Sequence, residues 1–121
     1  MIAKLEKSHG NVVGFKFHGK ASDEDYKERL IPEMEALIAK HSKIRVLWDL
    51  EHFDGWTPHA AWDDLVFGTR MWHDVERMAI VGDAKWEAAV MKLFAHLTAK
   101  FKYFDHHKLQ HAWEWLDEET A

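Results

Sequence analysis

One segment of the chain, residues 44–50 with the sequence IRVLWDL, holds five apolar residues that hardly alternate with polar ones. A strand of this kind is expected to be covered on both faces, as in a parallel sheet packed between helices. The segment continues into the acidic turn sequence Asp54-Gly55 and then into a helical pattern. It therefore predicts half of a parallel βαβ unit.

The first part of the chain predicts an antiparallel hairpin. Residues 2–7 and 12–18 are rich in apolar positions, and Ser8-His9-Gly10-Asn11 separates them. Gly and Asn tolerate the positive φ angles that tight turns need. We expect two paired strands here, with the second strand ending at about residue 18.

A helix is expected to follow the hairpin and to end near His41. Ser22 precedes three consecutive acidic residues, and a hydroxyl followed by carboxylates suits the free amides and the positive end of a starting helix. Pro32 lies inside the helical pattern. Proline removes one backbone donor and clashes with the preceding turn, so we expect a kink or a restart at Ile31.

The same alternation continues to the end of the chain. Apolar positions at helical spacing and short apolar runs predict a helix over 57–74, a strand over 78–81, a helix over 86–97, a strand over 101–104 and a last helix capped by Asp105. The predicted order is ββαβαβαβα, an α/β fold with a mixed, mainly parallel sheet and helices on both faces. We expect a single domain over 1–117 and a frayed tail over 118–121.

Composition narrows the function classes. A chain of 121 residues with 47% hydrophobic residues fits one domain, and its net charge of −5 disfavours nucleic-acid binding. Cysteine is absent, which removes disulfides, thiolate metal sites and cysteine nucleophiles. No apolar stretch of the length of a signal peptide or a membrane span is seen, so a cytoplasmic location without a transmembrane segment is expected.

Four segments, VLWDLEHFDGW, HAAWDDLVFGTR, MAIVGD and YFDHHKLQHAWEWL, appear in this order over about 110 residues. Together they resemble the SpoIIAA-like family of small bacterial proteins of the STAS/SEC14 type. The resemblance implies a STAS-like fold, usually without demonstrated catalysis, that is discussed as binding partner proteins or lipid-like ligands.

The related anti-sigma factor antagonists carry a phosphorylatable serine in an Asp-Ser-Ser-Gly turn before the second helix. This chain reads Asp54-Gly55-Trp56-Thr57-Pro58 at that place. Thr57 is thus a candidate phosphorylation site, while its other interpretation is a plain helix N-cap. Phospho-regulated signalling is kept as the weaker alternative because the two serines are missing.

Ligands of open α/β proteins bind where the strands end. The predicted order of strands and helices places several polar and aromatic residues there: His18, Lys20, Ser22, His52, Asp54, Trp56, Asp83, Trp86, Asp105, His106, His107 and His111. Of these, Trp56 and Trp86 are predicted to line an apolar crevice, and Lys20 or His106 to fix a polar head group. Packing in the core is the alternative role for each tryptophan.

His107 and His111 are four residues apart on a predicted helix, a spacing that suits a divalent metal. His52 or His106 would have to complete the site, and the alternative is a pair of solvated histidines. Lys108 stands where zinc proteases need glutamate, so that chemistry is excluded. No cofactor is predicted.

A hydrolase interpretation uses Ser22 as nucleophile, His52 or His111 as base, and Asp83 or Asp105 as the orienting acid. The nucleophile elbow Gly-x-Ser-x-Gly is missing. This interpretation therefore requires an engineered catalyst on this scaffold.

The favoured prediction is a noncatalytic module, expected to form a homodimer. It would bind a partner protein or an amphipathic, lipid-like small molecule at the strand-end crevice, by apolar burial with one charged group on the polar head.

Overall fold

The computed structural model describes residues 1–57, 72–83, 87–88 and 101–118. Its elements are β1 (Ile2–Lys4), β2 (Val12–Ala21), α1 (Asp23–Asp25), a π-helical segment (Tyr26–Leu30), α2 (Ile31–His41), β3 (Ile44–Trp56), a 3₁₀ turn (Trp72–Asp74), β4 (Val75–Gly82), β5 (Phe101–Asp105), a 3₁₀ turn (His106–Lys108) and α5 (Leu109–Asp117). Among these residues, no helix is long and apolar enough to cross a membrane.

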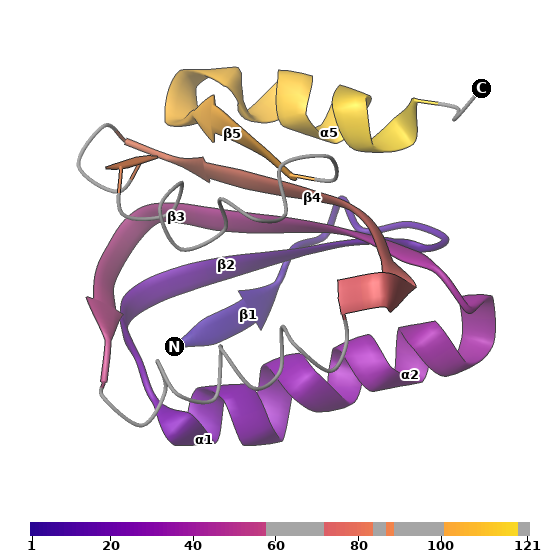
Figure 1. The fold of residues 1–121 in the computed structure, drawn as a ribbon. Helices are drawn as coiled ribbons and strands as arrows, with labels where there is room; N and C mark the ends of the chain where they lie inside the picture. Colours follow the sequence, from indigo (N-terminus) through magenta and orange to yellow (C-terminus); the bar gives the residue numbers. More distant parts are fainter. Residues whose placement is uncertain (58–71, 84–86, 89–100, 119–121) are drawn as a thin grey trace.

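The five strands form one sheet in the order β1-β2-β3-β4-β5 (Figure 1). β1 is antiparallel to β2, and the other three pairs are parallel. The prediction of a mixed, mainly parallel sheet is therefore confirmed. The strands lie in the order in which they occur along the chain, so the described sheet has no point at which the strand order reverses.

β3 is buried on both of its faces, as its apolar sequence predicted. Val46 and Trp48 pack in one core cluster with Tyr26 and Met34, whereas Leu47 packs in a second cluster with Trp113. Adjacent side chains of a strand point to opposite faces. The sheet thus separates two cores, and β3 contributes to each.

One helical layer covers each of these cores. In Figure 1, α1 and α2 lie below the sheet and α5 lies above it. Helices on both faces are therefore confirmed. The predicted helices over 57–74 and 86–97 lie outside the described residues, apart from a 3₁₀ turn at 72–74 and residues 87–88.

Ser22 caps the first helix, as predicted. Its hydroxyl accepts a hydrogen bond from the Asp25 amide, and the Asp25 carboxylate accepts one from the Ser22 amide, which forms a capping box.

The predicted restart at Ile31 is also found. A π-helical segment precedes it, and the Ile31 amide donates to the Tyr26 carbonyl. Pro32 has no amide hydrogen and would clash with a carbonyl in a regular α-helix. The wider π turn before it accommodates the ring.

Several strand boundaries differ from the sequence prediction, and β4 begins at Val75, three residues early. β1 stops at Lys4, three residues early, while β2 reaches Ala21 and β3 reaches Trp56. Gly19 and Gly55 have φ angles of +68° and +119°, and the β2–β3 register shifts between Gly19 and Lys20. Glycine allows a bulge here, so both strands bend and stay paired where the sequence predicted turns.

Two arginines from the sheet hold the carboxyl end of α5. Arg45 donates to the carbonyls of Leu116 and Glu118, and Arg77 donates to the Trp115 carbonyl at 2.6 Å. Arg45 also pairs with Glu76 at 2.7 Å. The last carbonyls of a helix lack helical partners and carry partial negative charge. The two guanidinium groups therefore fix this end of α5 on the sheet.

We predict that Gly14→Ala destabilises the fold by roughly 1–3 kcal/mol, a typical cost of overpacking. A β-carbon at Gly14 would lie 2.5 Å from Cη2 and 2.9 Å from Cζ2 of Trp113. Urea denaturation measures the loss. Trp113→Phe removes both atoms, so Gly14→Ala should cost less in that background. Equal costs in the two backgrounds would contradict this packing.

His9 joins the hairpin loop to α5. Its Nδ1 lies 2.7 Å from the Lys7 carbonyl oxygen, and its Nε2 lies 2.6 Å from Asp117 Oδ1. Both partners are acceptors, so both ring nitrogens are best protonated. The Lys7 carbonyl, followed by the Asp117 carboxylate, raises the pKa of His9 above its ordinary value of 6.5.

A raised pKa in the folded state predicts a definite pH dependence. The His9 contacts should stabilise the fold below the unfolded pKa, and this contribution should vanish as the pH rises through the folded pKa. The stability difference between wild type and His9→Gln should thus be larger at about pH 5.5 than at about pH 8.5. Asp117→Asn should reduce the pH dependence, and a difference that grows with pH would refute the assignment.

Candidate functional site

The carboxyl ends of the parallel strands lie along one edge of the sheet (Figure 1). His18 and His52 are register partners in β2 and β3, with ring centroids 6.0 Å apart. Lys20 and Asp54 are exposed nearby on the same two strands. Lys20, His52 and Asp54 were predicted to follow the strands. They lie within them instead, because the glycine bulges let the pairing continue.

The amino terminus occupies part of this edge. The Met1 ammonium donates to the His18 carbonyl at 2.7 Å and lies 3.5 Å from the Asp25 carboxylate. Burial of Asp25 opposes ionisation, but hydrogen bonds from Ser22 and the Met1 charge outweigh it and lower the pKa of Asp25. At the edge beside β2, the charges of the Met1 ammonium and the Asp25 carboxylate therefore neutralise each other.

Ser22 contacts the same carboxylate. Its hydroxyl donates to Asp25 Oδ2 at 2.9 Å and accepts from the Asp25 amide at 3.2 Å. Within the described part of the chain, no histidine hydrogen-bonds to Ser22. The geometry gives Ser22 a capping role, and neither His52 nor His111, the predicted bases, hydrogen-bonds to it.

Asp83 follows β4 and is held through its backbone. The Tyr103 hydroxyl donates to the Asp83 carbonyl at 2.7 Å. Burial and then the charge of Asp83 raise the pKa of Tyr103 to about 12. This phenol therefore stays protonated and serves as a hydrogen-bond donor.

The two histidines predicted to share the last helix, His107 and His111, lie in two different elements. His107 lies in the 3₁₀ turn and His111 in α5, so the two do not share a regular helix. The turn is instead set by Asp105, which accepts from the His107 amide at 2.9 Å. Asp105, His106 and His107 together form a compact cluster whose ligand atoms lie within 4.8 Å of one another.

Several predicted site residues are described only in part. Trp86 lies outside the described residues, and of Trp56 only the backbone is described. Thr57 is half-buried, and its amide donates to the Ala21 carbonyl at 3.0 Å. Its predicted role as N-cap of a helix over 57–74 concerns residues that lie outside the described ranges.

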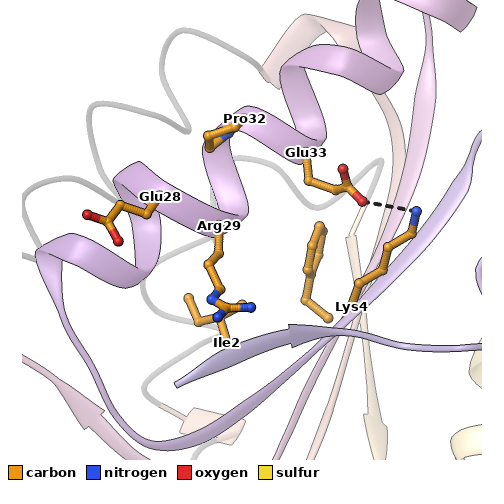
Figure 2. A pocket seen from close by; sticks show the side chains of 7 residues that line it. Ile2, Lys4, Glu28, Arg29, Pro32 and Glu33 are labelled. Atoms are coloured by element: carbon orange, nitrogen blue, oxygen red, sulfur yellow. Dashed lines mark ion pairs between the residues drawn. The ribbon is translucent and has the colours of Figure 1, made fainter.

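A groove that the sequence did not predict lies between β1 and the helix that starts at α1. Its volume is about 420 Å³. Figure 2 shows Arg29 reaching from the helix toward Ile2, while Lys4 and Glu33 meet farther along the groove. Seven residues line it: Ile2, Lys4, Phe15, Glu28, Arg29, Pro32 and Glu33. Of its lining residues, the sequence analysis singled out only Pro32, as an interruption of the helix.

A second hollow of about 520 Å³ lies over β5 and α5. His111 lines it, together with Lys102, Tyr103, Phe104, Lys108, Glu114, Trp115 and Glu118. Trp115 is half-buried, with the Arg77 guanidinium 5.1 Å from its ring centre. This hollow is polar at its rim, and its tryptophan is already packed within the chain.

Comparisons with known proteins agree with this fold. The family model described as SpoIIAA-like matches residues 12–117. Among solved structures, an uncharacterised protein from Shewanella loihica PV-4 with a SpoIIAA-like fold is 32% identical, with a TM-score of 0.78 over 95% of this chain and 93% of that one. A comparison with curated proteins finds no match.

We predict that Ser22→Ala lowers the free energy of unfolding by about 1 kcal/mol, a typical value for loss of an N-cap. Ser22→Thr keeps a hydroxyl and should retain most of the stability. Urea denaturation checks both. Hydrolysis of p-nitrophenyl acetate should be equal for wild type and Ser22→Ala, whereas a loss of turnover at unchanged stability would favour the nucleophile interpretation.

Proposed function

Because the chain belongs to the SpoIIAA-like family, as the sequence segments indicated, we propose that it is a noncatalytic binding module. Its ligand is an amphipathic small molecule with one anionic head group, and the groove beside β1 holds it. The observation that carries this proposal is the Arg29 guanidinium at the groove, which has no ion-pair partner among the described residues.

The charges around the groove favour an anion at one end. Lys4 and Glu33 neutralise each other at 3.0 Å, and Glu28 points away from Arg29 in Figure 2. Arg29 is therefore the cation left to bind a ligand. A guanidinium group binds a carboxylate or phosphate through two parallel hydrogen bonds.

The rest of the groove is partly apolar. Ile2 and Phe15 are buried beneath it, and Pro32 is exposed at its wall. The methylene stems of Lys4 and Arg29 add further apolar surface. The volume lies in the range of small-molecule sites, about 300–1,000 Å³.

The π-helical segment supports a functional role for this wall. Glu28 and Arg29 both belong to it. π turns occur often at functional sites, because one extra residue changes where the neighbouring side chains point. Here the segment keeps Tyr26 and Leu30 in the core and presents Arg29 at the groove.

The strand-end crevice expected from the sequence is the competing location for the same ligand. Lys20 and His106 line neither of the two described hollows. The ligand class proposed here is therefore the predicted one, while its place in the fold is new.

Titration with decanoate, followed by calorimetry and ¹⁵N NMR, tests the proposal. Decanoate should shift the amides of residues 2–4, 26–31 and 33, and Arg29→Gln should weaken binding by about tenfold, the effect of losing one charged hydrogen-bonded contact. Lys20→Gln, which removes a cation at the strand ends, serves as the matched control and should bind normally.

Decanol provides the second control, since its binding should not depend on Arg29. Amide shifts centred on Lys20 and Asp83 would move the site to the strand ends. If neither amphiphile binds, the ligand-binding function is wrong. The homodimer stays a prediction, which light scattering during gel filtration can test.

A further inference from the structure

We propose that Asp105, His106 and His107 form a binding site for a divalent transition-metal ion. This site lies where β5 ends, apart from the groove beside β1, and goes beyond the proposed function. It also differs from the pair His107 and His111 that the sequence suggested. Three consecutive residues supply one carboxylate oxygen and two imidazole nitrogens.

The distances place these atoms around one point. Asp105 Oδ1 lies 2.8 Å from His107 Nδ1 and 3.8 Å from His106 Nδ1. The centroids of the two imidazole rings lie 4.0 Å apart, and the ring planes are tilted by 37° to each other. The carboxylate oxygen and the two imidazole nitrogens thus lie within 4.8 Å of one another.

His106 provides the independent observation. Its Nδ1 atom is shielded from solvent and has no hydrogen-bond partner among the described residues, although the ring edge is partly exposed. A shielded polar atom without a partner costs free energy. A metal ion between His106 and Asp105 would satisfy this nitrogen, since the 3.8 Å separation is too long for a hydrogen bond.

The geometry also indicates the class of metal. With metal–ligand bonds of about 2.1 Å, donors 2.8 and 3.8 Å apart subtend angles of about 84° and about 130°. These values bracket the tetrahedral angle. Two imidazoles and one carboxylate suit Zn²⁺, Ni²⁺ and Cu²⁺, whereas Mg²⁺ and Ca²⁺ prefer oxygen ligands. Three protein ligands leave room for water or an external ligand.

The local fold holds the ligands in place before metal arrives. Asp105 is the N-cap of the 3₁₀ turn and accepts from the His107 amide, which fixes the backbone between the two side chains. In the metal-free chain, the His107 ring donates its Nδ1 hydrogen to Asp105. Metal binding would replace that hydrogen, so the carboxylate would keep a partner in both states.

Calorimetric titration of the untagged protein with Zn²⁺ tests the site. We expect one ion per chain, and Co²⁺ should give the visible absorption of a low-symmetry site. Asp105→Asn, His106→Ala and His107→Ala should each weaken Zn²⁺ binding by at least about tenfold, since even outer ligands of metal sites contribute that much. Asparagine still caps the turn, so Asp105→Asn separates lost ligation from lost structure.

His111→Ala is the matched control, because it removes a nearby histidine that the cluster does not use. Its Zn²⁺ affinity should stay within about twofold of wild type, well inside the loss expected for a ligand. Circular dichroism verifies that every variant is folded. Unchanged affinity in Asp105→Asn and His106→Ala, or a loss confined to His111→Ala or to the His18 and His52 variants, would overturn the proposal. Equal binding of Mg²⁺ would do the same.

Discussion

The burial of β3 on both faces is the constraint on which the rest of the structure depends. Side chains at even positions, such as Val46 and Trp48, enter the core between the sheet and α2. Leu47 enters the core between the sheet and α5. Because neither face can be left to water, the strand requires a helical layer on each side and a partner strand along each edge. The positions of β2, β4 and the two helical layers follow from these two requirements.

The two helical layers meet the sheet in different ways, and this difference decides where sites form. α5 is fixed by Arg45 and Arg77, which bind its last carbonyls, and by Trp113 over Gly14. The layer of α1 and α2 ends beside a three-residue edge strand, β1. An edge so short leaves part of the helix uncovered, and the groove with Arg29 lies there.

The order of the strands adds a second consequence. Open α/β proteins bind ligands at the carboxyl ends of their strands, at the point where the strand order reverses. There the connections that leave two adjacent strands run in opposite directions and open a crevice. The described sheet runs from β1 to β5 without a reversal. Its strand-end edge instead carries local clusters that satisfy themselves, such as Ser22 with Asp25. The turn after β5 leaves the shielded Nδ1 atom of His106 without a hydrogen-bond partner among the residues the structure describes.

The sequence by itself determined the fold class, the two-sided burial of β3, the cap at Ser22, the restart at Ile31 and the family. The first four depend on periodicity or on contacts within a few residues, and the family depends on the resemblance of four sequence segments; a linear pattern records both. Only the tertiary structure decided that β2 and β3 continue past their glycines, because pairing between distant strands satisfies the backbone there. It also decided which charges remain without partners. The isolation of Arg29 and the meeting of Asp105 with His106 depend on side-chain positions in space, and spacing along the chain does not encode them.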